Sequence, residues 1–279
     1  MTVHEHIAVA RVALERAGLT AVDARLDAEV LARHALGWDR AQLVADGREP
    51  MPAEAGDRYT GLIERRASRE PVAFITGRRE FWGLEFEVSP DVLIPRPETE
   101  LIVEAVRDRR DSEAVTTIVD VGTGSGCLAV VLAQEYPQAR VVATDISVAA
   151  LAVARRNARR HGVDDRVTFV AGDLLDAVRA PVDVIVSNPP YVPATVELAP
   201  EIVTFEPSVA LYSGDDGLTL LARLVADART RLRDAGLFVV EFGFGQDEDI
   251  LAFARDAGWQ RVEIIADLQG IPRTAVMVR

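Results

Sequence analysis

Short runs of apolar and β-branched residues alternate with helical stretches through the second half of the sequence. Parallel strands need a crossover between them, usually a helix, and strands buried on both faces read as continuous apolar runs. The alternation therefore predicts an α/β fold with a doubly wound sheet. The runs 262–265 and 274–278 have no helical stretch between them, so we expect a C-terminal antiparallel strand pair. The other predicted strands span residues 117–121, 139–143, 167–174, 183–187 and 236–243.

The fourth of these strands ends in the tetrapeptide Asn188-Pro189-Pro190-Tyr191. Two successive prolines forbid ladder hydrogen bonds and an immediate helix, and ligands of open α/β sheets bind just beyond the carboxyl ends of strands. The Asn188 side-chain oxygen and the Pro189 carbonyl can accept both hydrogens of an –NH2 group, while Tyr191 stacks on its plane. The tetrapeptide, Pro190 included, is therefore a candidate clamp for an NH2 group on an sp² carbon. The alternative is that it only caps a strand, with Tyr191 packed on the core.

A glycine-rich loop joins the first predicted strand to an apolar helix. Glycines permit close approach of a ligand and a helix N-terminus offers free N–H groups, so this arrangement predicts a nucleotide-binding site. Asp145, after the second strand, is placed to accept from both ribose hydroxyls, and Asp173, after the third, to read an adenine amino group. The spacing of Gly124, Gly126 and Ala129 also fits a dinucleotide such as NAD, so the glycines leave the cofactor open. The loop residues are Gly122, Thr123, Gly124, Ser125 and Gly126.

The N-terminal quarter of the sequence has a helical pattern without strand signals. Thr20 and Asp23 are expected to be the N-cap and capping-box partner of one of its helices. Gly83 lies between two alternating runs, which indicates the turn of a β-hairpin. A helical module beside a catalytic domain either binds a partner or braces the fold, and the sequence leaves both open. The predicted parts are a helical, partner-binding domain at 1–70, a β-hairpin linker at 71–90 and a catalytic domain at 91–279.

The polar stretch before the glycine loop leads into a predicted helix at 101–109. Pro97, or Thr99 as a cap, suits the start of this helix. Arg96 either forms a surface salt bridge or braces the active-site loop. Cys127, at a helix N-terminus, either has a lowered thiol pKa or is a small residue packed beneath the loop, and we expect packing.

Composition narrows the class of function. The formal charge is −13 and the chain contains no lysine, which weighs against a nucleic-acid duplex as direct partner. The single cysteine and the spacing of the four histidines predict neither a disulfide nor a metal site. No apolar run approaches the ~20 residues that span a bilayer, and the first residues lack a secretion signal. We therefore expect a cytoplasmic protein without membrane contact and, since no apolar seam is evident, a monomer.

Several segments together resemble the HemK-type release factor glutamine methyltransferase family of class I S-adenosylmethionine-dependent methyltransferases. The resemblance extends over nearly the whole chain. Leu-Ile-Pro-Arg-Pro-Glu-Thr-Glu at 93–100 is its most specific element, whereas the Asn-Pro-Pro-Tyr motif is shared with DNA adenine methyltransferases. The other matching segments are 71–77, 80–83, 120–126, 145, 188–191, 205–207, 216–217 and 241–246.

The resemblance implies a Rossmann-like catalytic domain that uses S-adenosylmethionine and releases S-adenosylhomocysteine. It implies that the glycine loop, Asp145 and Asn188 hold the cofactor, with Asp173 and Leu174 flanking its adenine. The family often has an aromatic residue near Leu174, so adenine stacking is expected to be weaker here. It further implies that the tetrapeptide holds the glutamine amide of a Gly-Gly-Gln loop in a peptide chain release factor. The catalytic residues are then Asn188, Pro189 and Tyr191, and the substrate-binding residues are these three with Pro190.

The expected chemistry is transfer of a methyl group to an amide nitrogen, which is a poor nucleophile because its lone pair is delocalised. Positioning carries much of the rate, and accepting both N–H hydrogens favours a transition state in which the nitrogen becomes positive. Rival functions are a ribosomal-protein glutamine methyltransferase, a DNA adenine N6-methyltransferase and a catalytically silent cofactor-binding protein. An NAD dehydrogenase is disfavoured because no hydride-transfer site accompanies the glycines.

Overall fold

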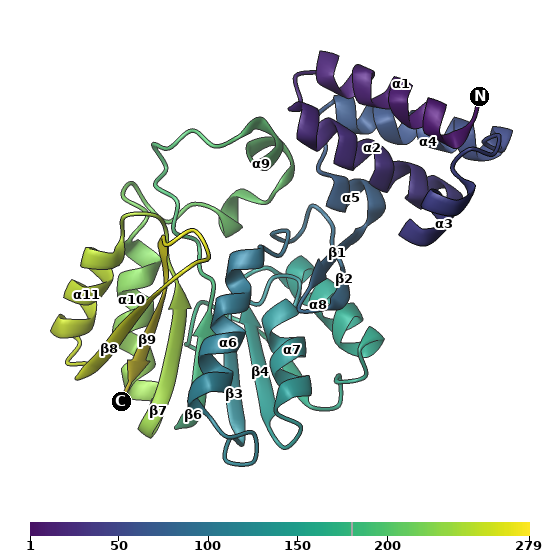
Figure 1. Ribbon diagram of the computed structural model, residues 1–279. Coiled ribbons are helices and arrows are strands. Elements are labelled where there is room, and N and C mark those ends of the chain that lie inside the picture. The colour runs from purple at the N-terminus through teal and green to yellow at the C-terminus, as the bar shows by residue number, and fades with distance from the viewer. Residues whose placement is uncertain (180) are drawn as a thin grey trace. The chain divides into compact units, whose positions relative to one another are not determined.

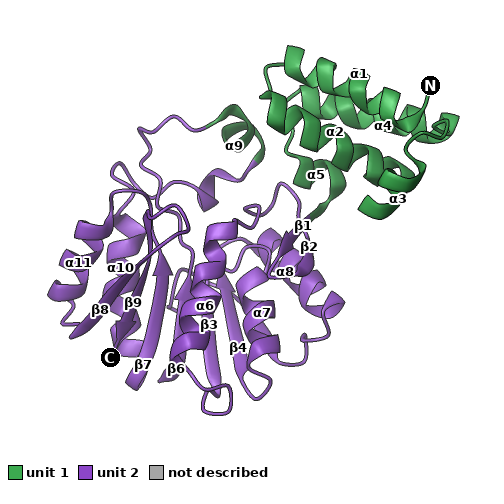
Figure 2. Cartoon of the chain, in the orientation of Figure 1, with its two compact units in different colours: residues 1–78, 199–205 green, residues 79–198, 206–279 purple. Residues whose placement is uncertain are grey.

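The computed structural model describes residues 1–179 and 181–279. Figure 1 shows the helices and strands along the chain, and Figure 2 shows that the chain divides into two compact units. The first unit comprises residues 1–78 and 199–205, and the second comprises 79–198 and 206–279. A short segment far along the chain therefore belongs with the N-terminal helices.

A seven-stranded sheet forms the centre of the second unit. Its strands are β3 (Thr117–Val121), β4 (Arg140–Asp145), β5 (Val167–Ala171), β6 (Val182–Ser187), β7 (Leu232–Glu241), β8 (Arg261–Ala266) and β9 (Pro272–Val278). They lie in the order β5-β4-β3-β6-β7-β9-β8; β9 runs antiparallel to β7 and β8, and the other neighbours are parallel. The doubly wound sheet and its C-terminal antiparallel pair are confirmed. The strand order reverses between β3 and β6, which is where such sheets bind ligands.

Helices cover both faces of the sheet (Figure 1). One face carries α6 (Glu100–Arg109), α7 (Cys127–Glu135) and α8 (Val148–Arg160), and the other carries α10 (Thr219–Arg231) and α11 (Asp247–Asp256). Successive side chains of a strand point to opposite faces. Ile118 and Val184 accordingly lie in the core beneath the first group, and Val119 and Ile185 in the core beneath the second. Burial on both faces explains why these strands read as unbroken apolar runs.

A two-stranded hairpin precedes the sheet and consists of β1 (Arg78–Phe81) and β2 (Leu84–Glu87). Trp82 and Gly83 form its turn with φ of 55° and 71°, and two positive values are what a type I′ turn requires. The Trp82 backbone N–H donates to Glu100 at 2.8 Å and its indole N–H to Glu135 at 3.1 Å. The hairpin predicted around Gly83 is thus confirmed, and its turn is held by α6 and α7.

The prediction of a β-hairpin is wrong for the N-terminal part of its segment, because residues 72–76 are helical. Helix α5 (Val72–Thr76) begins after Pro71 and ends at Gly77, which has a φ of 71°. Its apolar residues resemble a strand in sequence, but Ile75 packs into the core of the helical unit. A proline before the first residue and a left-handed glycine after the last are helix boundary signals, and they outweigh the β-branched composition.

The first unit is a helical bundle whose core consists mainly of alanine, leucine and isoleucine side chains, with one buried aromatic residue, Tyr59. Its other N-terminal helices are α1 (Val3–Arg16), α2 (Ala21–Leu36), α3 (Arg40–Asp46) and α4 (Ala53–Ala67). Thr20 caps α2 as predicted, since its hydroxyl oxygen accepts from the Asp23 N–H at 3.1 Å. Asp23 accepts from the Thr20 hydroxyl and not from its backbone N–H, so the reciprocal capping box is absent there. None of the helices in the described part of the chain is both long and apolar enough to span a membrane.

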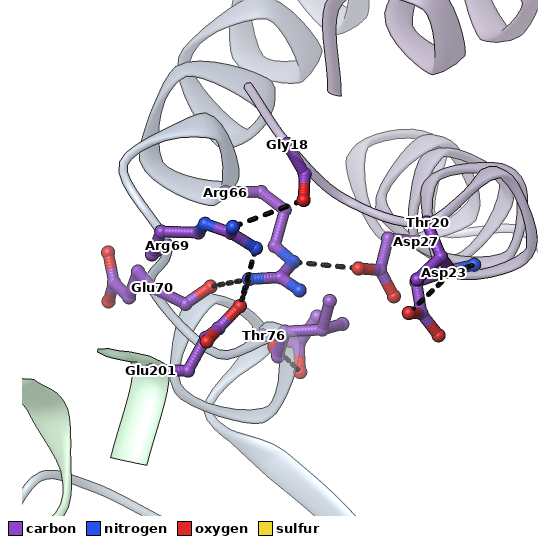
Figure 3. A network of polar contacts seen from close by, with 10 residues as sticks. Gly18, Thr20, Asp23, Asp27, Arg66, Arg69, Glu70, Thr76 and Glu201 are labelled. Carbon is purple, nitrogen blue, oxygen red and sulfur yellow. Dashed lines mark hydrogen bonds and ion pairs between the residues drawn. The ribbon is translucent and has the colours of Figure 1, made fainter. Parts of the chain in front are cut away.

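Helix α9 (Pro200–Phe205) joins this unit through buried and half-buried charges (Figure 3). Glu201 accepts from Arg69 at 2.9 Å and lies 3.8 Å from Arg66. Arg66, which is 8% exposed, also donates to Asp27 of α2 at 2.7 Å. The sequence analysis did not foresee this helix, because its attachment depends on residues more than 130 positions away in the chain.

The glycine loop between β3 and α7 adopts backbone conformations that favour glycine. Gly124 and Gly126 have φ of 53° and 82°. A Cβ atom at Gly126 would lie 2.9 Å from the Cβ and 3.1 Å from the Cα of Ala154 in α8, whereas one at Gly124 would meet nothing within 4 Å. Gly126 is therefore required for helix packing as well as for the turn.

We predict that Gly126→Ala lowers the free energy of unfolding by at least ~2 kcal/mol, because left-handed strain adds to overpacking against α8. Gly124→Ala is the matched control and should cost only about 1 kcal/mol from strain alone. Urea unfolding of both variants measures the difference. Equal losses in the two variants would contradict the proposed contact.

Candidate active site

The predicted loop, acids and tetrapeptide come together at one pocket of about 170 Å³ at the carboxyl ends of the parallel strands. Two further segments complete the pocket wall. The segment before α6 contributes Arg96 and Thr99, and the segment after α9 contributes Pro207. Gly126, Pro189 and Tyr191 are not among the residues that line it. The predicted residues that do line it are Gly122, Thr123, Gly124, Ser125, Asp145, Asp173, Leu174, Asn188 and Pro190.

Asp145, the last residue of β4, is held in a defined orientation at the pocket. Its two carboxylate oxygens accept backbone N–H groups from Gly124 at 2.9 Å and Ser147 at 2.8 Å. Burial raises the pKa of Asp145, and these hydrogen bonds oppose the rise. Each carboxylate oxygen has more than one acceptor position, so Asp145 retains capacity to accept hydroxyl groups of a ligand.

Asp173 and Leu174 follow β5 and line the pocket beside Asp145. Asp173 is partly exposed and accepts from Arg223 of α10 at 2.7 Å. Leu174 has a φ of 46°, an uncommon value for a branched residue. Its carbonyl accepts from the Thr144 hydroxyl at 3.0 Å, which holds this backbone in place.

Asp120 is a buried carboxyl group beneath the glycine loop, at 1% exposure. One of its oxygens accepts from the Thr123 hydroxyl at 2.6 Å and from the Ala129 N–H at 3.1 Å. Its other oxygen has no partner among the described residues. Burial raises the pKa of Asp120 to about 7. Asp120 thus ties the loop to the first turn of α7 by two hydrogen bonds that a carboxylate accepts.

Cys127 is a packing residue and not a reactive thiol. It is buried in the core beneath α7, and burial raises the pKa of its thiol to about 12. Its thiolate is therefore scarce near neutral pH, as the packing interpretation of the sequence expects.

The tetrapeptide after β6 is held by a chain of three hydrogen bonds. The Asn188 Nδ2 donates to the Thr99 Oγ1 at 2.9 Å, and the Thr99 hydroxyl donates to the Glu241 Oε2 at 2.7 Å. The Tyr191 hydroxyl donates to the Glu241 Oε1 at 3.0 Å. Within residues 1–179 and 181–279, neither the Asn188 Oδ1 nor the Pro189 carbonyl accepts a hydrogen bond. The Asn188 oxygen, on a residue that lines the pocket, is consequently available to accept from a ligand, whereas Pro189 is buried and does not line the pocket.

Thr99 and Glu241 are site residues whose roles the sequence analysis missed. Thr99 occupies the N-cap position of α6, one of the two starts expected for this helix, but its backbone is helical and its hydroxyl makes no capping hydrogen bond. It ends a 3₁₀ turn, Pro97–Thr99, and is 3% exposed. Glu241 is the last residue of β7 and is 1% exposed. An acidic residue at the end of a buried apolar strand could have indicated a site residue, because such residues are seldom buried without a partner. Burial raises the pKa of Glu241 to about 7 and also raises that of the Tyr191 phenol.

Arg96 braces the loop that follows α9. Its guanidinium donates to Glu206 at 2.5 Å, and the other Glu206 oxygen accepts the Ile94 N–H at 3.0 Å. The Glu206 side chain is only 2% exposed. This contact favours the bracing interpretation of Arg96 over a surface salt bridge, because its partner Glu206 is a buried acid in the segment beside the pocket.

The charge of the pocket lining is acidic. Asp91, Asp145 and Asp173 contribute carboxylates, whereas Arg96 is the one basic residue among the described lining residues. No group of three metal-ligating side chains is found in the described part of the chain. Such a pocket attracts a positively charged ligand and disfavours one with several phosphates.

Comparisons with known proteins agree on a methyltransferase. A family model described as the PrmC N-terminal domain matches residues 5–77, and one described as the methyltransferase small domain matches residues 97–205. The chain is 45% identical to a Burkholderia pseudomallei protein named release factor glutamine methyltransferase, over 257 residues that cover 90% of each sequence.

Solved structures share the fold at low sequence identity. The hMettl16 catalytic domain, in complex with a MAT2A 3'UTR hairpin, has a TM-score of 0.59 at 16% identity and covers 89% of this chain and 92% of that one. A T. thermophilus 16S rRNA methyltransferase in complex with AdoMet and guanosine has a TM-score of 0.53 at 18% identity, covering 72% of this chain and 49% of that one. Both likenesses describe the Rossmann-like class I methyltransferase fold.

The buried Asp120 predicts a pH dependence of stability. Because its folded-state pKa is raised, its contribution to stability is full below pH ~4 and is lost as the pH rises through about 7. Asp120→Asn removes this loss, so its stability relative to the wild type should rise between about pH 4 and pH 7, by up to about 1.4 kcal/mol per pH unit. Urea unfolding at several pH values measures it, and a constant difference would contradict the assignment.

Proposed function

The chain belongs to the family of release factor glutamine methyltransferases, and we propose that it methylates the side-chain amide N5 of a glutamine in a peptide chain release factor. S-adenosylmethionine is the proposed methyl donor, S-adenosylhomocysteine the product, and a Gly-Gly-Gln motif the acceptor. The observation that carries the proposal is the Asn188 side chain. Its NH2 group is fixed on Thr99 while its oxygen is left as an acceptor at the pocket wall.

The pocket residues fit S-adenosylmethionine. Asp145 suits the ribose hydroxyls, because its carboxylate is oriented by Gly124 and Ser147 and retains acceptor positions. In the proposed complex, Asp173 and Leu174, which line the pocket, flank the adenine ring. When bound, the cofactor supplies an electrophilic methyl group on a sulfonium. The acidic lining favours this cation over a dinucleotide, whose pyrophosphate is negatively charged.

The tetrapeptide supplies the positioning that an amide nitrogen requires. In the proposed complex, the Asn188 Oδ1 and the Pro189 carbonyl accept the two hydrogens of the glutamine NH2 group. Tyr191 stacks on the amide plane, and its hydroxyl is anchored on Glu241. These acceptors gain strength as the nitrogen becomes positive, so they stabilise the transition state more than the ground state. The proton then leaves after methyl transfer without a dedicated base.

Two rival substrates are separated by a direct assay. A ribosomal-protein glutamine offers the same amide, and adenine in DNA offers the same planar amino group, although the net charge of −13 disfavours a duplex. The assay supplies labelled S-adenosylmethionine with a release factor, with that factor carrying an altered Gly-Gly-Gln glutamine, with ribosomal protein, and with duplex DNA. Label confined to the unaltered factor supports the proposal. Label in another acceptor, or in none, would overturn it.

We predict that Asn188→Ala lowers kcat for methyl transfer by about 10²–10³-fold, because one preorganised transition-state contact is lost. The dissociation constant for S-adenosylmethionine should change by less than about threefold. Gln134→Ala is the control, since it removes an exposed amide of α7 that does not line the pocket. Steady-state kinetics and calorimetric titration measure the two quantities, and near-normal turnover of Asn188→Ala would exclude the clamp.

A further inference from the structure

The hydrogen-bond chain from Glu241 to Asn188 has a direction. The Thr99 hydroxyl carries a single hydrogen, and this hydrogen is donated to the Glu241 Oε2 at 2.7 Å. Thr99 can therefore only accept from its other neighbour. That neighbour is Asn188 at 2.9 Å, which must present its NH2 group to Thr99. The Asn188 oxygen is consequently turned to the opposite side.

This direction decides what the pocket offers to a substrate. An asparagine amide has nearly the same shape when it is rotated by 180°, so packing alone does not select its orientation. With its oxygen outward, Asn188 accepts from an NH2 group. With its NH2 group outward, Asn188 would direct its own N–H hydrogens at those of the substrate NH2 group, and no hydrogen bond could form. The choice between a productive and a repulsive site thus depends on Glu241, which is not among the residues that line the pocket.

We propose that Thr99 and Glu241 are positioning residues that fix the orientation of the Asn188 amide, and that ionised Glu241 is required for it. This inference rests on the proposed function. A protonated Glu241 can donate to Thr99, which frees the Thr99 hydrogen for the Asn188 oxygen and permits the reversed amide. The ionised carboxylate can only accept, and it accepts from Thr99 and Tyr191 together.

The groups around Glu241 determine the pH range in which it changes between its ionised and protonated forms. Glu98 faces it from the 3₁₀ turn and disfavours its negative charge, whereas Arg273 of β9 favours it. The Tyr191 hydroxyl donates to it, and the positive charges of Arg273 and Arg96 act on Tyr191 in turn. Burial is the largest influence and raises the pKa of Glu241 to about 7. Productive orientation should therefore be lost as the pH falls through about 7.

Thr99→Val and Thr99→Ser test the proposal together. Valine has the shape of threonine without the hydroxyl, so we expect kcat for methyl transfer to fall at least tenfold while the dissociation constant for S-adenosylmethionine stays within about threefold. Serine restores the hydroxyl and should restore kcat to within about threefold of the wild type. Thermal unfolding verifies that both variants are folded. Equal kcat in wild type and Thr99→Val would overturn the proposal.

The pH profile provides a readout that a merely structural role would not change. The wild-type kcat should fall about tenfold per pH unit below an apparent pKa near 7, because only ionised Glu241 fixes the amide. Glu241→Gln cannot ionise, so its kcat should be reduced and should lack this acidic limb. The same acidic limb in Glu241→Gln would contradict the assignment.

A spectroscopic measurement separates this proposal from the proposed function. The side-chain NH2 signals of Asn188, assigned by comparison with Asn188→Ala, report the contact with Thr99 without any substrate. We expect their shifts to titrate with Glu241 in the wild type and not in Glu241→Gln, and to move in Thr99→Val. Signals that are unaffected by both substitutions would overturn the positioning role. A wild type that transfers no methyl group to the release factor would instead overturn the proposed function.

Discussion

A single buried carboxylate, Glu241, joins the segments that build the tetrapeptide site. Thr99 lies 142 positions before it and Tyr191 lies 50 before it, and both donate to its oxygens. A buried charge is costly unless hydrogen bonds compensate for its lost hydration. Those same hydrogen bonds hold the start of α6 and the end of β6 against the end of β7. The hydrogen bonds that one buried acid requires therefore fix the geometry of the tetrapeptide, which is the proposed substrate clamp.

Asp120 performs the corresponding task beneath the glycine loop. It is a buried acid near the end of β3, accepts from a threonine hydroxyl, and has a pKa raised to about 7 by burial. Its partner Thr123 is only three residues away, however, whereas the partners of Glu241 come from distant segments. The glycine loop is thus organised locally and the tetrapeptide by tertiary contacts. The parallel strands bring the two arrangements to one pocket because their carboxyl ends share one edge of the sheet.

What could be predicted from the sequence follows this division between local and tertiary causes. The sheet, its antiparallel pair, the Gly83 turn and the Thr20 cap depend on periodicity or on neighbouring residues, and the structure confirms them. The glycine loop, Asp145 and the tetrapeptide were found because each follows a strand directly. Helix α5 was mistaken for strand because its composition is β-branched, and α9 was missed because Glu201 depends on distant arginines. The role of Thr99 was missed for the same reason, since its hydroxyl bonds to Glu241, which is remote in sequence.

We propose that Asn188 presents its oxygen to the amide of a glutamine because Thr99 and Glu241 hold it in that orientation. The most direct measurement is a crystal structure of the protein with S-adenosylhomocysteine and a release factor that carries the Gly-Gly-Gln motif. We expect the glutamine nitrogen within hydrogen-bond distance of the Asn188 Oδ1 and the Pro189 carbonyl, with the Asn188 Nδ2 still donating to Thr99. A glutamine bound elsewhere, or an Asn188 side chain detached from Thr99, would contradict it.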